Sequence, residues 1–464
     1  WGPVGWPADP IAGGCSFLGY FNEGLIRNDW ENNILPWLAT DWDLDIAADG
    51  SATAIFDLRQ GVKFHDGTDF NADAVAYCLN AYAEEQARPW TKVTALDTYR
   101  VEIFLPVWKN TFWTTLVSTA NAIVSPTAVE TNGKDWLRQH PVGTGPFKVT
   151  EYSSDKGVTM VKNTEYWQEG KPYLDSIQVI YLDEFTTKRD AMIAGEIDQM
   201  AFEIGYEASQ VLELGLPSQV KYNATCNMYP DSKSGDSPWG NIKVREALSY
   251  AIDREGLAAA LGYGLCEAKY SIIPRDMPGY DPDYKGQPYD PEKAKQLLAE
   301  AGYPNGFETK FVIYPTMPKD LGAALQKFVA DIGITAQVEY PQLAGYAEYR
   351  NATWKNAILV EPAAFYPDVV YLPLTVYWNP EGYMFASMDR TPEFIAAYNA
   401  AVTAPYPDTA LNAKVFDVLQ DQFLVIPIWE VGRGFAHSED LMGTDFFKYG
   451  YWFIHPIEEA WLDR

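Results

Sequence analysis

Residues 56–67 of the chain read FDLRQGVKFHDG, and this stretch decides how the first part of the protein is organised. It begins with residues typical of a strand, and its two glycines predict two turns around a second, short strand. Asn71 follows at a suitable helix N-cap position, because its short side chain can accept a hydrogen bond from the first helical turn. We therefore predict a helix over 72–88, with one face formed by Val75, Leu79 and Tyr82.

Length and composition indicate a large globular protein. The chain has 464 residues, 47% of them hydrophobic, which is enough for two or three structural units with sizeable cores. The formal net charge of -28 argues against nucleic acid and against an anionic membrane surface, both of which attract Lys and Arg. The charge either solvates the surface or, in a sharper interpretation, draws cationic ligands toward the protein. Aromatic residues reach 15%, and their flat rings suit both a core and a ligand site.

The start of the chain and its apolar runs give no sign of membrane insertion. No run is long enough to span a bilayer, and Trp1-Gly2-Pro3 lacks the basic start and apolar core of a signal peptide. We therefore expect a trimmed mature form.

Cysteine and histidine give little support for redox, metal or catalytic chemistry. The four cysteines, Cys15, Cys78, Cys226 and Cys266, form no CxxC pair, and we expect buried free thiols, with a Cys226–Cys266 disulfide as the alternative. The four histidines form no HExxH motif, and no GxSxG elbow occurs. A calcium-like spacing over 281–292 places Lys285 where an oxygen ligand is needed, so we predict no metal site.

Further motifs follow the opening stretch along the chain. They are VGTGPF at 142–147, RDAMIAGEID at 189–198, an amphipathic helix predicted over 243–254, and a helix predicted over 290–302. Asp290 is the expected N-cap of the last helix, with Pro at its first turn and Gly302 past its end. Residues 232–238, SKSGDSP, have the composition of a linker.

Taken in this order, the motifs resemble the extracellular solute-binding proteins of ABC importers, in the large peptide, nickel and oligosaccharide group called family 5. The resemblance implies an α/β, two-lobed periplasmic-binding-protein-like fold with a hinge and an inserted subdomain in the first lobe. Lobe I would comprise 1–32, 141–224 and the C-terminal return 434–464. The inserted subdomain would be 33–140, and lobe II would be 225–433.

The resemblance also implies a function. The chain would be an extracytoplasmic receptor that captures a small solute between two lobes by hinge closure and delivers it to the transmembrane permease subunits of an ABC importer. It would be no enzyme, need no cofactor, bind no nucleic acid and act as a monomer. It would be periplasmic or extracellular, with a lipoprotein tether left open. The alternative is a ligand sensor or chaperone-like surface protein of the same fold that takes no part in transport.

The ligand site is where the chain departs from the family pattern. Peptide-binding members carry a segment like G-W-x-A-D-Y-x-D-P, whose first Asp pairs with the terminal ammonium of the peptide. The matching run, residues 361–369, reads EPAAFYPDV and places Phe365 at that Asp. A buried ammonium without a carboxylate partner carries a penalty of roughly several kcal/mol. Phe365 thus favours an oligosaccharide or another ring-bearing solute, with a short peptide, or a cationic amine near Glu361, as alternatives.

The correspondence implies a set of ligand-binding residues. An exposed loop carboxylate is an equal interpretation of Glu361. Arg350 could meet a carboxylate, with a solvent-facing side chain as the default. The predicted ligand-binding residues are Cys15, Tyr20, Glu361, Phe365, Tyr366, Trp378, Trp429 and Glu430.

Overall fold

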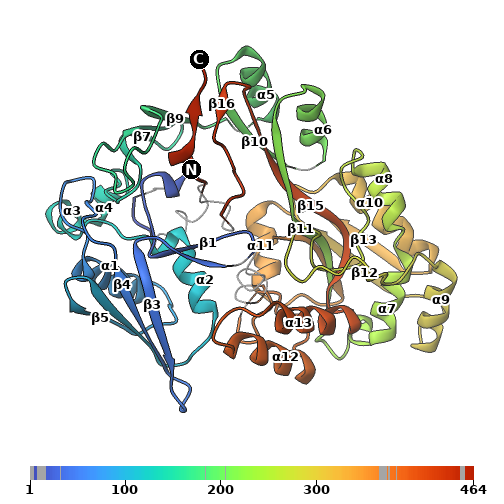
Figure 1. Ribbon diagram of the computed structural model, residues 1–464. Helices are drawn as coiled ribbons and strands as arrows, with labels where there is room; N and C mark the ends of the chain where they lie inside the picture. The colour runs from blue at the N-terminus through green and yellow to red at the C-terminus, as the bar shows by residue number, and fades with distance from the viewer. Residues whose placement is uncertain are drawn as a thin grey trace. The chain divides into compact units, whose positions relative to one another are not determined.

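The computed structural model divides the chain into two compact α/β units (Figure 1). Unit 1 comprises Trp1–Met200, Thr403–Pro407 and His437–Arg464, and unit 2 comprises Ala201–Val402 and Asp408–Ala436. The structure describes residues 5–7, 17–31, 33–182, 184–203, 205–364, 374, 377–382, 384–449 and 455–464.

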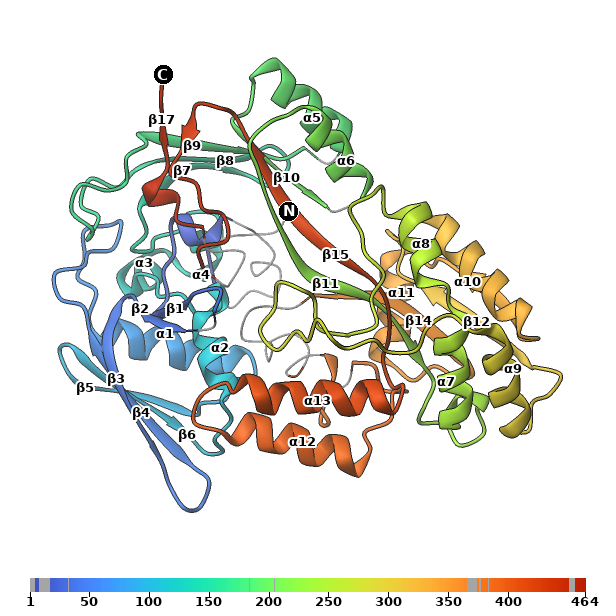
Figure 2. The same ribbon diagram turned by 45° about the vertical axis from the view of Figure 1, so that its right-hand side comes forward.

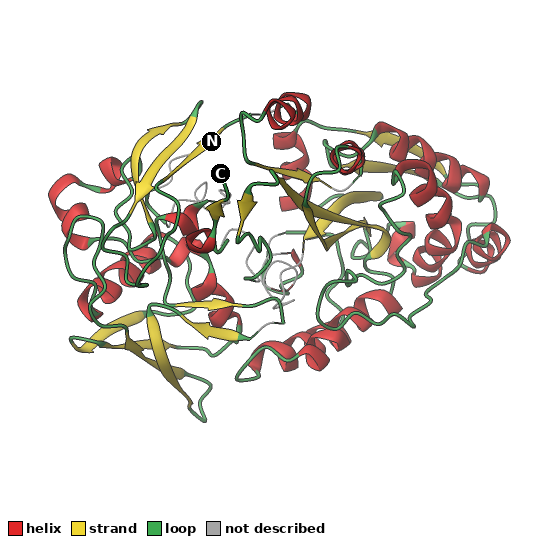
Figure 3. Ribbon diagram, turned by 45° about the horizontal axis from the view of Figure 1, so that its top comes forward, coloured by secondary structure: helices red, strands yellow, loops and turns green. Residues whose placement is uncertain are grey.

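Unit 1 is built on small sheets with short helices (Figure 3). Its paired strands are β1 (Ile26–Asn28) with β2 (Ile34–Pro36), and β16 (Leu441–Met442) with β17 (Trp461–Leu462). A four-stranded antiparallel sheet has the order β3 (Ala39–Ile46), β4 (Ala52–Leu58), β6 (Arg100–Leu105), β5 (Lys92–Asp97), and a three-stranded sheet has the order β7 (Phe147–Ser153), β8 (Gly157–Lys162), β9 (Ser176–Ile180). The helices are α1 (Ala72–Glu85), α2 (Thr111–Val117), α3 (Pro126–Asn132), α4 (Lys134–Leu137) and α5 (Phe185–Ala194), with 3-10 turns at Leu18–Tyr20, Thr119–Asn121 and Ile457–Glu459.

The opening stretch of the sequence behaves as expected only in part, because the predicted second strand is reduced to an isolated bridge between Lys63 and Asp69. Its first residues end β4, where Phe56 is fully buried, and helix α1 begins directly after Asn71. The Asn71 side chain accepts a hydrogen bond from the backbone N–H of Ala74 at 3.0 Å. The predicted cap and the apolar face of this helix are therefore confirmed, but the helix ends at Glu85 and not at residue 88.

Unit 2 is built on one six-stranded sheet with helices packed on it (Figures 1 and 2). The strand order is β10 (Gln199–Glu203), β15 (Ile426–His437), β11 (Ser218–Pro230), β14 (Ala357–Ala364), β12 (Glu308–Ile313), β13 (Thr335–Glu339). The helices are α6 (Tyr206–Glu213), α7 (Ile242–Ala251), α8 (Arg254–Leu261), α9 (Pro291–Glu300), α10 (Lys319–Asp331), α11 (Leu343–Asn351), α12 (Pro392–Thr403) and α13 (Thr409–Asp421), with a 3-10 turn at Pro238–Gly240.

Register assigns the residues of this sheet to two faces. Side chains alternate along a strand, and directly paired residues point to the same side. One face forms a hydrophobic core with helices α7 to α10, and it includes Cys226, Met228, Ile358, Val360 and Trp429. The opposite face carries Asn227, which pairs with Glu361, and Thr225, which pairs with Glu430. The two acidic residues predicted to bind ligand therefore share the face that is turned away from this core.

Of the two helices predicted in the second half of the chain, one is confirmed and the other is divided. The predicted helix 290–302 is confirmed as α9, whose N-cap Asp290 accepts from the N–H of Lys293 at 2.8 Å. The predicted helix 243–254 is wrong in its extent, because α7 ends at Ala251 and Asp253 caps a separate helix, α8, by accepting from Gly256. An aspartate at an N-cap position has a non-helical backbone, so Asp253 separates the end of α7 from the start of α8.

The predicted linker 232–238 lies inside unit 2 and does not join the two units. Lys233 donates its backbone N–H to the carbonyl of Ser387, and the Ser232 hydroxyl accepts from Asp389. The chain passes from one compact unit to the other at 200/201, 402/403, 407/408 and 436/437. The lobe boundaries and the inserted subdomain drawn from the family resemblance stay predictions.

The cysteines within the described residues are free thiols, as expected for Cys78, Cys226 and Cys266. Cys226 pairs with Trp429 from one side of β15, and Ala268, two residues after Cys266, bridges Trp429 from the other side. Cys15 lies outside the described residues. None of the helices in the described part of the chain is both long and apolar enough to cross a membrane.

Candidate functional site

The candidate site centres on Glu361 of β14 and Arg350 near the end of α11, both in unit 2. Arg350 donates from Nη1 to Oε1 of Glu361 at 2.9 Å. The Glu361 side chain is 5% exposed and that of Arg350 is 23% exposed. Glu361 is therefore not the exposed loop carboxylate that was one interpretation of the sequence, and Arg350 is not simply solvent-facing.

Two polar atoms of this pair are left without a hydrogen-bond partner. Among the described residues, none bonds to Oε2 of Glu361 or to Nε of Arg350, and both atoms are buried. The Tyr346 hydroxyl is near Glu361, but by geometry it donates to the carbonyl of Val360 at 3.4 Å. An unsatisfied buried polar group costs about 1–3 kcal/mol, and in native proteins such groups call for an explanation, of which a ligand is one.

Burial and the opposite charge of the partner shift the pKa of each group in this pair in opposite directions. Burial raises the pKa of Glu361 more than the charge and hydrogen bond of Arg350 lower it. For Arg350, burial lowers the pKa, but the attraction and hydrogen bond of Glu361 outweigh it, and the net shift is upward. When both groups are ionised, the pair has no net charge.

Tyrosine side chains surround the pair. The pKa values of Tyr229, Tyr314, Tyr346 and Tyr377 are all raised, first by burial and next by the negative charge of Glu361. Tyr314 and Tyr346 meet edge to face, with ring centroids 5.2 Å apart. Aromatic faces of this kind stack on rings and apolar groups, while hydroxyls hydrogen-bond. Tyr229 and Tyr346 are fully buried, whereas Tyr314 and Tyr377 are only partly buried, so the latter two can contact a ring-bearing solute and offer it hydroxyls.

Glu430, the other predicted acidic residue, is engaged by two cations. Its Oε1 accepts from the backbone N–H of Arg275 at 2.7 Å and lies 2.8 Å from Nζ of Lys269. Its Oε2 accepts from Nε of Arg275 at 2.5 Å. Arg275 also pairs with Glu267 and stacks over Tyr222, 4.0 Å from the ring centroid. Both carboxylate oxygens are satisfied by the protein itself.

The predicted aromatic residues pack in apolar surroundings. Trp429 is 4% exposed and belongs to the core between the sheet and helices α7 to α10. Trp378 is fully buried and meets Phe416 of α13 edge to face at 5.7 Å. Tyr20 lies in unit 1, 5% exposed, and its pKa is raised by burial and by Glu458. Their contacts with a ligand stay predictions.

Three of the predicted site residues, Cys15, Phe365 and Tyr366, lie outside the described residues. What the sequence missed is the pairing of Arg350 with Glu361. Eleven positions separate the two residues, and they lie on different elements, so no spacing rule pairs them. The only signal was the place of Arg350 as the basic residue in the last turn of α11.

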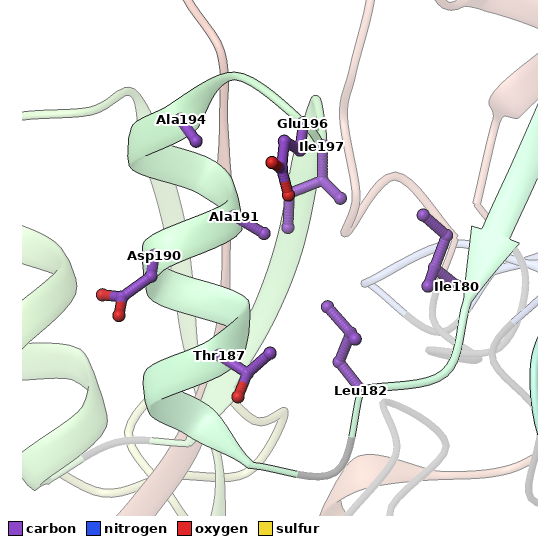
Figure 4. A pocket seen from close by; sticks show the side chains of 8 residues that line it. All are labelled: Ile180, Leu182, Thr187, Asp190, Ala191, Ala194, Glu196 and Ile197. Atoms are coloured by element: carbon purple, nitrogen blue, oxygen red, sulfur yellow. The ribbon is translucent and has the colours of Figure 1, made fainter.

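A separate depression of about 470 Å³ lies in unit 1 between the end of β9 and helix α5 (Figure 4). Ile180 and Leu182 form one side, and Thr187, Ala191 and Ile197 face them. None of the predicted ligand-binding residues lines it. We therefore base the candidate site on the Arg350–Glu361 pair, where buried polar atoms lack partners. No cluster of His, Cys, Asp or Glu that could hold a metal ion occurs within the described residues.

Comparison with known proteins gives concordant matches. The family model described as bacterial extracellular solute-binding proteins, family 5 (middle) matches residues 33–381. Glutathione-binding protein GsiB of Shigella flexneri serotype 5b (strain 8401) is 35% identical over 331 residues, which are 68% of this chain. The match spans 63% of the length of that relative, so the chain covers less than two thirds of it.

Solved structures with a similar fold cover nearly the whole chain. The ABC transporter-associated periplasmic binding protein DppA from Helicobacter pylori, in complex with peptide STSA, has a TM-score of 0.77 and 23% identity and covers 100% of this chain and 97% of its own. The binding protein AgaA from A. tumefacien R10, in complex with agropinic acid, has a TM-score of 0.75 and 21% identity, with coverages of 96% and 93%. These likenesses show the two-lobed α/β fold of periplasmic binding proteins.

Proposed function

The chain belongs to family 5 of the bacterial extracellular solute-binding proteins, and from this we propose that it is the extracytoplasmic receptor of an ABC importer. The observation that carries the proposal is the family match over residues 33–381, most of the chain. The relatives that match are solute-binding proteins rather than enzymes. We propose that this chain likewise captures a solute and breaks no bond in it.

The proposed ligand is a small ring-bearing solute, an oligosaccharide before a short peptide. The partly buried Tyr314 and Tyr377 near the Arg350–Glu361 pair support a ring-bearing ligand, because aromatic faces stack on rings. A cationic amine is the less favoured alternative, since the charge of Glu361 is already compensated by Arg350 at 2.9 Å. Phe365, at the position of the family's ammonium-binding Asp, supports the same order of preference. The contacts of Tyr20, Tyr366, Trp378 and Trp429 with this solute belong to the proposal.

Several further features belong to the proposal. The protein works as a monomer, in the periplasm or outside the cell, with a lipoprotein tether as an option. It hands its ligand to the transmembrane permease subunits, and hinge closure of the two lobes retains the ligand until then. A sensor or chaperone-like surface protein of the same fold is the second candidate, and a neighbouring sensor kinase gene, in place of permease and ATPase genes, would favour it.

A thermal-shift screen tests the receptor function. The panel contains di- and tripeptides, cello-, xylo- and manno-oligosaccharides, and amines. A ligand present at 100 times its dissociation constant stabilises the folded state by about 2.7 kcal/mol, which raises the melting temperature. We expect stabilisation by a ring-bearing member, which mass spectrometry recovers unaltered. Conversion of the ligand into a product would contradict the proposal. Stabilisation by free-amine peptides that is lost on N-acetylation would overturn the ligand assignment.

A further inference from the structure

The Arg350–Glu361 pair has an asymmetry that bears on ligand choice. The arginine side chain is 23% exposed, whereas the carboxylate behind it is 5% exposed. A solute that reaches the pair therefore meets the guanidinium first. Because the arginine is paired with a buried carboxylate at 2.9 Å, the solute meets hydrogen-bond donors without a net positive charge.

The guanidinium also has donors to spare. It has five N–H groups, and Glu361 is its one hydrogen-bond partner among the described residues. Other buried arginines of unit 2 are used differently. Arg254 donates to the carbonyls of Pro427 and Ser249 and to the Ser249 hydroxyl, so its three nitrogens all have partners. The donors of Arg350 that have no partner among the described residues, with Nε one of them, thus match oxygen acceptors that a ligand would bring.

We infer that Arg350 contacts the ligand and that Glu361, by compensating its charge, makes the site select uncharged solutes with hydroxyl or carbonyl oxygens over solutes with a carboxylate. This inference rests on the proposed function and adds the chemical class of its ligand. Hydroxyl and carbonyl oxygens accept from a guanidinium without bringing a charge of their own. A carboxylate would gain from Arg350 but would be repelled by Glu361. Glu361 is a positioning residue, since it acts through Arg350.

The test compares Glu361→Gln with a matched control, Glu339→Gln. Glutamine keeps the size of the side chain and its ability to accept from Arg350, but removes the compensating charge. Glu339 also sits in unit 2, lies 3.4 Å from Nζ of Lys310, and accepts from the Tyr349 hydroxyl next to Arg350. The control therefore makes the same chemical change in an ion pair beside α11.

The probes are matched neutral and acidic compounds. One pair is xylotriose and its glucuronic-acid-substituted form, and the other is N-acetyl-dialanine amide and N-acetyl-dialanine with a free carboxylate. Calorimetric titration gives the ratio of the two affinities for each protein. We expect the wild type and Glu339→Gln to favour the neutral member, and Glu361→Gln to shift the ratio at least tenfold toward the acid.

Two results would overturn the inference while leaving the receptor function intact. One is a wild type that favours the acidic member of its preferred pair. The other is a ratio that Glu361→Gln leaves unchanged. A third result also counts against the inference: none of the four compounds binds the wild type or Glu361→Gln, although another solute of the screen does bind. Failure of every solute to bind contradicts the proposed function itself.

A second variant covers the case in which Glu361→Gln does not fold. Arg350→Gln removes the charged donor, and we expect at least a tenfold loss of affinity for the neutral probe. Arg350→Lys restores one charged donor and should recover part of that affinity. A structural role alone would lower the melting temperature of Arg350→Gln without changing the affinity of the folded protein, and that result would refute the inference.

Discussion

Unit 2 holds two buried carboxylates on the same face of its sheet, and the protein treats them differently. Glu430 is fully buried, and its two oxygens receive two N–H groups of Arg275 and the ammonium of Lys269. Glu361 is nearly as buried, yet one oxygen meets one arginine and the other meets no donor among the described residues. The two carboxylates are similar in burial and in charge, and they differ in the number of hydrogen-bond donors that contact them. We use this difference to distinguish a carboxylate that stabilises the fold, Glu430, from one that belongs to a candidate ligand site, Glu361. The predictions that follow test this difference.

The largest effect should come from Glu430→Ala. Removing one partner of a buried ion pair leaves the other charge uncompensated and costs about 3–5 kcal/mol. Here Lys269, 5% exposed, would lose its carboxylate partner. Denaturant unfolding of the wild type and the variant measures the loss. If the variant kept wild-type stability but lost ligand binding, Glu430 would belong to the site and the distinction would be wrong.

Phe365→Asp should have the next largest effect. The family resemblance predicts that Phe365 stands where peptide-binding members hold a ligand ammonium, so a carboxylate there should weaken the proposed ring-bearing ligand. We expect about a tenfold change, or 1.4 kcal/mol, together with gained affinity for peptides that carry a free amine. Calorimetry with the same ligand before and after the substitution gives both numbers. Unchanged binding would place residue 365 outside the site.

Lowering the pH should act on Glu361 in the same direction as Glu361→Gln, but more weakly. Burial raises the pKa of Glu361, and the titratable groups among the described residues that interact with it are Arg350, Tyr229, Tyr314, Tyr346, Tyr377 and Cys226. As the pH falls toward that raised pKa, Glu361 takes up a proton and the positive charge of Arg350 is no longer balanced. A ligand carboxyl with a pKa of about 3.5 stays ionised in this range.

We therefore expect the wild-type preference for a neutral over an acidic ligand to shrink as the pH falls from 7 toward the raised pKa of Glu361. The same proton uptake stabilises the folded state as the pH falls through the raised pKa, since the ionised form is the one that burial penalises. Calorimetric titrations across the pH range give the ratio. A ratio that falls equally in Glu361→Gln would assign the effect to another group.

The smallest effect should come from Glu339→Gln. Its side chain is 38% exposed, and ion pairs of this kind contribute about 0–1 kcal/mol. Unfolding stability and ligand affinity should both stay close to the wild type. A tenfold loss of affinity would extend the ligand site to the Lys310–Glu339 pair.

The sequence predicted well those features that depend on neighbouring residues. The caps at Asn71 and Asp290 and the helices that follow them are local in sequence, and both were found where expected. The helix predicted over 243–254 was extended too far, because apolar spacing continues past Ala251 while the Asp253 cap interrupts it. Local rules can predict a helix and miss where it is divided.

The candidate site is formed by residues on different helices and strands, which local sequence patterns do not bring together. Glu361 was proposed because of its place four residues before Phe365, but its partner was not, since only the packing of α11 near β14 brings Arg350 to it. Trp429 and Glu430 are adjacent in sequence, yet register turns Trp429 toward the core and Glu430 to the opposite face. Strand register and a bulge next to Cys226 decide this, and neither is visible in composition.

The most direct measurement compares Arg350→Met with Arg275→Met by calorimetric titration of one ligand, alongside their melting temperatures. Arg275 serves the satisfied cluster of Glu430, and Arg350 serves the pair with unused donors. We predict that Arg350→Met lowers the affinity of the folded protein at least tenfold, and that it also lowers the melting temperature, because it leaves the buried carboxylate of Glu361 without its cation. We predict that Arg275→Met lowers the melting temperature while its folded protein binds as the wild type does. The reverse pattern of affinities would contradict the assignment of Arg350 and Glu361 to the ligand site.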